Sequence, residues 1–332
     1  MKNFKPILTA MSLCMALAAA AAPVRQHLHD DWQFRQARLN NWYPATVPGT
    51  VHTDLMANRI IEDPYFRLNE RGVQWVDKED WMYQTTFVPT EAELAANNCE
   101  LVFYGLDTYA DVYLNGSPLL NADNMHRTWR VDVKDKLKRG ENKLEVYFHS
   151  PIKIDLPKCD QYDYGFNTGP DQSQNGGIFD KLVSIFARKA GYHYGWDWGP
   201  RLVTSGIWRP VVLEAWNGPR LADVQVIQNK VTDRRADLTL VSEVIADSDV
   251  PAANLTVTAD GKQIAARTVA LKKGMNRIEM PATVKNPRLW WPNGLGEAYL
   301  YNLTTAVNVD GTASDTDTKK IGLRSIVLHN DK

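Results

Sequence analysis

Short runs of alternating apolar and polar residues make up most of the chain after residue 80. Alternation with a period of two is typical of strands that bury one face, and Gly, Asn, Asp and Pro interrupt these runs. The clearest predicted strands cover residues 81–88, 100–104, 110–114 and 142–148. Helical spacing is rare, and residues 51–61 are the main short example. The pattern therefore predicts an all-β protein with antiparallel strands.

Three dipeptides between alternating runs predict β-hairpins. A type I′ turn needs positive φ at both central residues, and Asn-Gly and Asp-Gly adopt this conformation readily. The three predicted turns are Asn115-Gly116, Asp260-Gly261 and Asp310-Gly311.

The character of the chain changes at about Pro219, after which aromatic residues become fewer and Thr, Val and Ala more frequent. Residues 219–332 are predicted to form a small β-sandwich of immunoglobulin type. Residues 22–218 are too long for one seven-stranded sandwich. They fit a larger jelly-roll sandwich with long loops, the longest of which is expected from Ser150 to about Ser184.

The N-terminal residues have the pattern of a secretory signal. Lys2 and Lys5 precede an apolar stretch over residues 7–18, and small residues follow to Ala22. The apolar stretch is short for a membrane-spanning helix. Residues 1–21 are therefore predicted to be a cleaved signal peptide of a periplasmic or extracellular protein, without membrane insertion.

Charge and motifs exclude several classes of function. The chain has 38 Lys plus Arg and 39 Asp plus Glu, so it lacks the basic surplus expected of a nucleic-acid-binding protein. It contains no phosphate-binding or dinucleotide-binding glycine motif and no cysteine cluster with metal spacing. We therefore expect no nucleic-acid partner, no metal site and no cofactor. The sequence leaves open whether Cys99 and Cys159 form a disulfide.

The strongest candidate for a binding site lies in residues 191–200, which place five aromatic side chains, counting His193, around one carboxylate. A sugar offers a flat C–H face to aromatic rings and hydroxyl groups to a carboxylate. Trp196, Asp197 and Trp198 provide both kinds of group. The alternative is a Trp-rich core turn in which Asp197 bonds to the loop backbone.

Other aromatic and histidine residues point less clearly to chemistry. Trp290 and Trp291 precede a proline, an arrangement that we interpret as packing between layers. His126, His149 and His193 are acid/base candidates by residue type. Nothing in their spacing pairs them with a nucleophile.

Several sequence blocks together resemble the N-terminal part of family 2 glycoside hydrolases, and most of all the β-mannosidases. The related exo-β-glucosaminidases are the nearest alternative. The blocks cover residues 42–55, 105–116, 188–190, 195–201, 205–210 and 290–294.

The resemblance implies a retaining, exo-acting glycosidase with a galactose-binding-like jelly roll, an immunoglobulin-like sandwich and a (β/α)₈ barrel. The barrel would carry the two catalytic glutamates. Trp196, Asp197 and Trp198 would contribute to binding a terminal β-mannoside, with Asp197 accepting hydrogen bonds from sugar hydroxyls.

A barrel needs about 250 residues. The sequence given extends only to Lys332, shortly after a segment that resembles the last strand of the second sandwich. The barrel is therefore expected to be missing, the catalytic residues to lie beyond Lys332, and the chain to be inactive alone. Asp160, Asp163 and Asp171 are carboxylates near Asp197 in sequence, but a polar loop supports a catalytic pair poorly.

Two alternatives remain open. The chain could be a stand-alone, non-catalytic carbohydrate-binding protein, in which case Trp196 and Asp197 would form a usable site without a barrel. It could also be a purely structural sandwich for protein contacts, which would leave the Trp196–Trp198 block unexplained.

Overall fold

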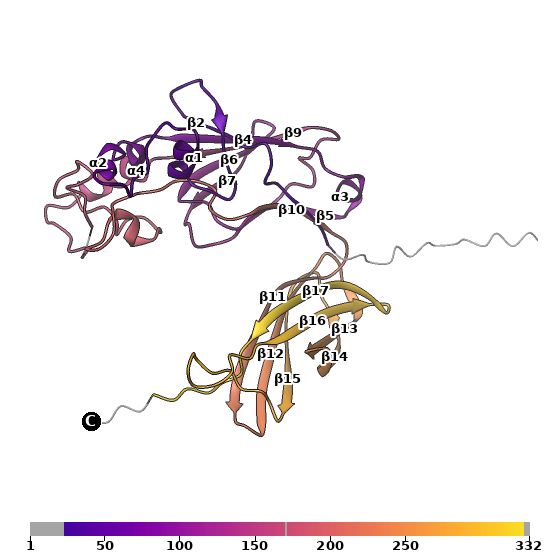
Figure 1. Ribbon diagram of the computed structural model, residues 1–332. Coiled ribbons are helices and arrows are strands. Elements are labelled where there is room, and N and C mark those ends of the chain that lie inside the picture. The colour runs from indigo at the N-terminus through magenta and orange to yellow at the C-terminus, as the bar shows by residue number, and fades with distance from the viewer. Residues whose placement is uncertain (1–22, 170, 329–332) are drawn as a thin grey trace, which may run out of the picture. The chain divides into compact units, whose positions relative to one another are not determined.

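The computed structural model describes residues 23–169 and 171–328 (Figure 1). The predicted signal peptide, residues 1–21, lies outside this range. The described residues divide into two compact units, Pro23–Trp216 and the residues from Asn217 onward. Both units consist mainly of antiparallel strands, which confirms the predicted all-β class.

The first unit is a sandwich of two antiparallel sheets. One sheet has the order β1 (Val24–His27), β10 (Val211–Trp216), β5 (Asn98–Phe103), β8 (Trp129–Asp132). The other has the order β3 (Tyr43–Pro44), β2 (Gln33–Gln36), β4 (Trp81–Phe87), β9 (Asn142–Phe148), β6 (Tyr109–Leu114), β7 (Ser117–Asp123).

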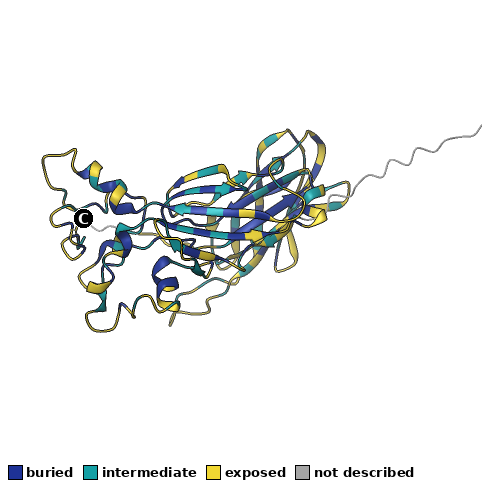
Figure 2. Cartoon of the chain, turned by 90° about the horizontal axis from the view of Figure 1, so that it is seen from above, coloured by how far each residue is buried: buried dark blue, intermediate teal, exposed yellow. Residues whose placement is uncertain are grey.

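The core of this unit forms because alternate residues of the strands face inward. Phe34, Tyr83, Phe103 and Phe148 are fully buried in one cluster that draws on both sheets. The rings of Tyr83 and Phe148 meet edge to face with centroids 5.7 Å apart. Buried residues accordingly gather in the strands, and exposed residues follow the loops (Figure 2).

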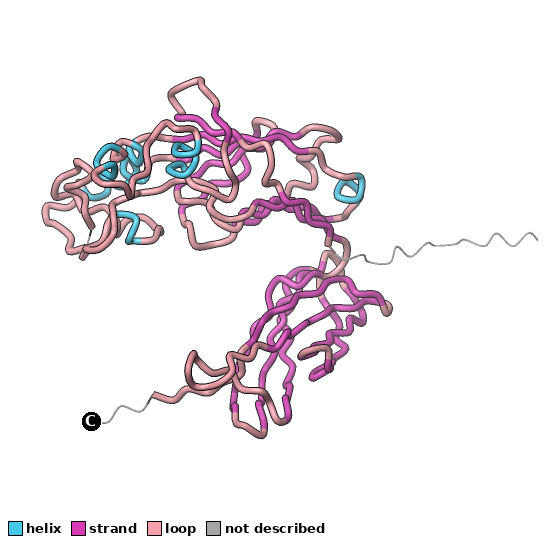
Figure 3. Tube along the Cα trace, in the orientation of Figure 1, coloured by secondary structure: helices cyan, strands magenta, loops and turns pink. Residues whose placement is uncertain are grey.

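Short helices join the strands of the first unit. They are α1 (Val51–Ala57), α2 (Asn69–Gly72), η1 (Val76–Lys78), α3 (Glu91–Ala95), α4 (Pro151–Cys159) and η2 (Gly191–Tyr194). Helices α2 and α4 lie with the long loops at one end of the unit, and α3 lies at the other end (Figure 3).

Helix α4 corrects the expectation of a continuous loop from Ser150 to about Ser184. The Ser150 hydroxyl accepts a hydrogen bond from the Lys153 amide at 3.1 Å, and Pro151 occupies the first helical turn. A serine cap followed by proline is a helix-start signal in the sequence. The rest of the segment, to Ser184, contains no other helix or strand among its described residues.

Helix α1 is fixed to the core through Asp54, which is 1% exposed. Its carboxylate accepts hydrogen bonds from the Thr46 amide at 2.8 Å and the Tyr83 hydroxyl at 2.7 Å. Burial raises the pKa of Asp54 from 3.8 to about 6 despite these two donors.

We expect this carboxyl group to make stability depend on pH. The folded state favours neutral Asp54, so its contribution is present at pH 4 and is lost as the pH rises through 6. Relative to Asp54→Asn, the wild type should therefore lose about 2–3 kcal/mol of unfolding free energy between pH 4 and pH 7. Urea unfolding at each pH, with exposed Asp135→Asn as the control, measures this difference. A difference independent of pH would contradict the assignment.

The second unit has seven strands in two antiparallel sheets, which is the strand number of an immunoglobulin constant-type sandwich. One sheet has the order β11 (Arg220–Val231), β12 (Arg235–Ala246), β15 (Gly274–Lys285). The other has the order β14 (Lys262–Leu271), β13 (Val250–Ala259), β16 (Tyr301–Val309), β17 (Thr312–Ile321).

All three predicted hairpin turns are confirmed. Asn115-Gly116 joins β6 to β7, Asp260-Gly261 joins β13 to β14, and Asp310-Gly311 joins β16 to β17. Both residues of each turn have positive φ, between 48° and 79°.

The tryptophan pair of the second unit serves packing, as we interpreted it. The Trp290 amide donates to the Leu323 carbonyl at 3.0 Å. The guanidinium carbon of Arg324 lies 5.9 Å from the ring centroid of Trp290 and 4.7 Å from that of Trp291. These contacts attach the segment after β17 to the sandwich.

Candidate functional site

The candidate site is built around a tight turn at the helical end of the first unit. The Trp196 amide donates to the Gly199 carbonyl at 3.2 Å, and the Gly199 amide donates back to the Trp196 carbonyl at 3.3 Å. Trp196 is 38% exposed and Trp198 is 81% exposed, with ring centroids 6.3 Å apart. The turn therefore presents two large rings to solvent.

The residue before the turn must be glycine. Gly195 has φ of 103°, and a Cβ there would lie 2.7 Å from the Gln172 side chain. Gln172 in turn donates through its side-chain amide to the Trp196 carbonyl and through its backbone to the Tyr194 carbonyl. Close backbone packing thus fixes the start of the turn.

Asp197 is exposed on this turn between the two tryptophans. Within the described part of the chain, its carboxylate makes no hydrogen bond or ion pair. This geometry does not fit the alternative of a core turn in which Asp197 bonds to the loop backbone. The carboxylate is available to an external ligand.

A cavity of about 490 Å³ lies beside the turn, lined by Trp196, Trp198 and Gly199 but not by Asp197. Its opposite wall comes from α1 and the residues around it, including His52 and Tyr65. The two walls are far apart in sequence but are joined by the Val51 amide, which donates to the Ser205 carbonyl at 2.8 Å.

Two histidines face this cavity. His52 is 6% exposed and His193 is half-buried, and both belong to the lining. Burial, together with the positive charge of Lys189, lowers the pKa of each imidazole from 6.5 to about 4. Both side chains are therefore neutral at pH 7.

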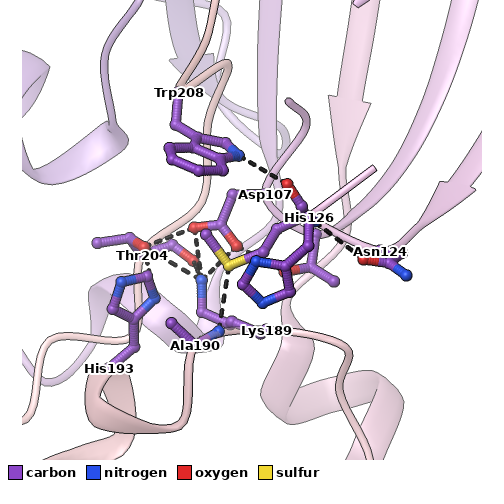
Figure 4. Close-up of polar contacts among 10 residues, drawn as sticks. Asp107, Asn124, His126, Lys189, Ala190, His193, Thr204 and Trp208 are labelled. Carbon is purple, nitrogen blue, oxygen red and sulfur yellow. Dashed lines mark hydrogen bonds and ion pairs between the residues drawn. The ribbon is translucent and has the colours of Figure 1, made fainter. Parts of the chain in front are cut away.

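A buried ion pair supports the cavity from behind (Figure 4). The Lys189 ammonium donates to both carboxylate oxygens of Asp107 and to the Thr204 carbonyl, the last at 2.8 Å. Burial would raise the pKa of Asp107, but the Lys189 charge and hydrogen bonds hold it below its ordinary value. The Thr204 hydroxyl links the pair to His193, with 3.2 Å between Oγ1 and Nδ1.

A second buried cation holds the segment that follows the turn. The Arg201 guanidinium lies 2.6 Å from the Asp77 carboxylate and donates to the Gln74 side chain at 2.8 Å. The Arg201 amide donates to the Glu70 carboxylate at 2.7 Å. Arg201 thus joins the turn segment to α2 and η1 and takes a framework role.

The other carboxylates considered as a catalytic pair lie away from the cavity lining. Asp160 pairs with Lys181 at 2.7 Å. Asp171 accepts from the Ser173 hydroxyl at 2.6 Å and from the Ser184 amide at 3.1 Å. Asp163 lines a different, smaller cavity. The described residues that line the candidate cavity include no Asp or Glu.

The remaining acid/base candidates also lie elsewhere. His149 contacts Asp111 at 2.8 Å between Nε2 and Oδ2, and His126 is exposed. Neither lines the cavity. Of the three candidate histidines, the structure brings only His193 to the turn.

Other features carry no site within residues 23–169 and 171–328. No group of three or more His, Cys, Asp or Glu in these ranges could hold a metal ion, and no helix there is long and apolar enough to cross a membrane. Cys99 and Cys159 are buried as free thiols.

Sequence reasoning missed several residues of the cavity, notably His52, Tyr65, Tyr192 and Thr204. His52 and Tyr65 are far from the tryptophan block in sequence, and only the fold brings them there. The resemblance had marked the blocks that contain Asp107, Lys189 and Arg201, but it gave no role for these three residues.

Comparison with known proteins identifies the class of protein. Residues 32–209 match the glycosyl hydrolase 2 galactose-binding domain-like family, and residues 220–324 match glycosyl hydrolases family 2. The chain therefore belongs to glycosyl hydrolase family 2.

The more specific relatives are β-mannosidases. The chain is 33% identical over 320 residues to β-mannosidase B of Aspergillus terreus, covering 93% of this chain and 36% of that protein. It is 34% identical to β-mannosidase B of Aspergillus niger, covering 94% and 37%. The chain spans about a third of the length of these curated relatives and corresponds to their N-terminal part.

Solved structures agree. The β-D-mannosidase of Dictyoglomus thermophilum matches with a TM-score of 0.82 and 35% identity, covering 92% of this chain and 37% of that one. The exo-chitosanase CsxA of Amycolatopsis orientalis matches with a TM-score of 0.64 and 20% identity, which shows the shared fold alone.

Proposed function

We propose that the chain forms the sugar-binding and sandwich domains of a β-mannosidase that removes terminal, non-reducing β-D-mannose residues. One observation carries the proposal. The open Trp196–Gly199 turn, with a free Asp197 carboxylate, stands beside an aromatic cavity in a chain 35% identical to a β-D-mannosidase.

In this proposal the first unit contributes to binding, and hydrolysis belongs to another part of the enzyme. A retaining glycosidase needs two carboxyl groups about 5–5.5 Å apart. The described lining of the cavity has none. We therefore place the acid/base and the nucleophile in the portion of the relatives that this chain does not span.

The substrate proposal favours β-mannosides over β-glucosaminides. Identity to the β-D-mannosidase is 35%, whereas identity to the exo-chitosanase is 20%. The second candidate function is a stand-alone carbohydrate-binding protein. It is favoured by one observation, namely that every residue lining the cavity belongs to the first unit.

The test compares the whole chain alone with the chain joined to the part of the Dictyoglomus thermophilum β-D-mannosidase that this chain does not match. We expect only the joined enzyme to hydrolyse 4-nitrophenyl β-D-mannopyranoside. Turnover by the chain alone that disappears in Asp197→Ala would contradict this division of roles.

We further propose export to the periplasm or the extracellular space, on the basis of the basic and apolar pattern of residues 1–21. Expression of the whole chain in a bacterial host, followed by N-terminal sequencing of the exported fraction, tests this. Cleavage near Ala20 or Ala21 is the expected result. Retention of Lys2 and Lys5 in a cytoplasmic product would contradict it.

A further inference from the structure

We propose that the cavity beside the turn is a second saccharide-binding site, formed wholly by the first unit, and that His193 accepts a hydrogen bond there from a sugar hydroxyl through Nε2. The site is separate from the proposed mannose contact of Asp197, because Asp197 is absent from the lining. The inference adds both a site and a residue to the proposed function.

Size and wall chemistry favour a sugar. A volume of about 490 Å³ falls within the range of small-molecule sites. The aromatic lining comes from Trp196, Trp198, Tyr65 and Tyr192, all of which keep a large part of their surface exposed. Flat rings exposed beside a cavity suit the C–H face of a pyranose.

The charge of the lining selects a neutral ligand. The described lining contains no Asp, Glu, Lys or Arg, and both of its histidines are neutral at pH 7. A phosphate or carboxylate ligand would find no opposite charge in the wall. The polar groups are instead the hydroxyls of threonines, such as Thr50 and Thr53, and the two imidazoles. Such groups suit a neutral polyol.

The network behind the cavity determines which nitrogen of His193 carries the proton. The Thr204 hydroxyl donates its hydrogen to Asp107 Oδ2 at 2.5 Å and accepts from the Lys189 ammonium at 3.1 Å. Only a lone pair remains on Thr204 Oγ1 for His193 Nδ1, so Nδ1 is the donor. Neutral His193 therefore has a bare Nε2.

Nε2 of His193 is left for a ligand. This nitrogen makes no hydrogen bond within the described part of the chain, and the ring lines the cavity. A bare imidazole nitrogen accepts a hydrogen bond, and a sugar hydroxyl is a suitable donor. The Asp107–Lys189–Thr204 network thus prepares His193 as an acceptor (Figure 4).

His52 provides an independent sign of a binding site. Its side chain is more than nine-tenths buried in the cavity wall, and Nδ1 is buried without a hydrogen-bond partner among the described residues. Buried polar atoms in proteins are usually paired. A ligand hydroxyl would supply the partner that the protein does not.

The charged and titratable groups around His193 keep it in the accepting form. Burial and Lys189 lower its pKa to about 4, Asp107 opposes them, and His52 and His126 add small effects in the same direction as Lys189. Binding should therefore be constant near neutral pH. It should weaken as the pH approaches 4, where protonation removes the acceptor.

Calorimetric titration of the whole chain with methyl β-D-mannopyranoside and with β-1,4-mannobiose tests the site. We expect binding by the wild type and a 5- to 10-fold weaker affinity for His193→Ala, the loss expected for one hydrogen bond. Exposed His126→Ala is the matched control and should bind as the wild type does. Asp197→Ala should also retain binding, and its loss in that variant would overturn the separation of the two sites.

Histidine ¹⁵N NMR of the wild type decides the role of His193 even if His193→Ala proves unstable. We expect Nδ1 to carry the proton, and Nε2 to have the shift of an unprotonated nitrogen that changes on saturation with sugar. A proton on Nε2, or an Nε2 shift unchanged at saturation, would overturn the role. A wild type that binds neither saccharide would overturn the second site, while hydrolysis by the joined enzyme independently tests the proposed function.

Discussion

Replacing Lys189 with Met should lower the free energy of unfolding by about 3–5 kcal/mol, because it leaves the Asp107 carboxylate buried without its cation. Both side chains are at most 1% exposed. Lys189 also donates to the Thr204 carbonyl and hydroxyl, so its removal affects the wall that carries His193. Urea unfolding of the whole chain, followed by tryptophan fluorescence, measures the loss.

Two comparisons make this prediction sharp. Lys143→Met breaks the exposed pair with Glu145 and should change stability little. The double variant Lys189→Met with Asp107→Leu removes both buried charges and should recover part of the loss. A Lys189→Met protein as stable as Lys143→Met would show that the pair does not hold the unit together.

Removal of the Asp197 carboxylate should lower kcat/KM of the joined enzyme for 4-nitrophenyl β-D-mannopyranoside by about 10- to 100-fold. A hydrogen bond to a charged group contributes about 1.5–3 kcal/mol, which sets this range. Asp197 is exposed and makes no hydrogen bond within the described part of the chain, so Asp197→Ala should not lower the melting temperature.

Asp160→Ala is the matched control, because Asp160 is an exposed carboxylate that pairs with Lys181 away from the cavity lining. It should keep the kcat/KM of the unmodified joined enzyme. Asp197→Asn, which retains the shape of the side chain but not its charge, should have an intermediate value. An unchanged kcat/KM in Asp197→Ala would remove Asp197 from the mannose-binding site.

Local features of the fold were readable from the sequence, because period-two alternation and turn chemistry act over a few residues. The prediction for residues 142–148 coincides with β9 (Asn142–Phe148), and Asp260-Gly261 forms the expected turn. Helix α4 was missed because a single serine cap was weighed against a long polar loop. Nearest-neighbour signals of this strength are easily overruled by composition.

The geometry of the cavity could not be derived from the sequence, because it depends on contacts between distant residues. Asp107 and Lys189 are 82 positions apart, and their pairing follows from how the loops close over the sandwich. His52 is likewise carried to His193 by α1 and not by sequence proximity. The tryptophan block was visible in advance because its members are adjacent, so composition alone singled it out.

The most direct test of the account is the size and activity of the protein in its native host. Extracts should be fractionated by mass, probed with an antibody against residues 23–328, and assayed with 4-nitrophenyl β-D-mannopyranoside. We predict that the antigen and the activity elute together, at a mass above 37.6 kDa by at least the roughly 28 kDa of a barrel of about 250 residues. An antigen at the mass of this chain, with the β-mannosidase activity in other fractions, would contradict the account.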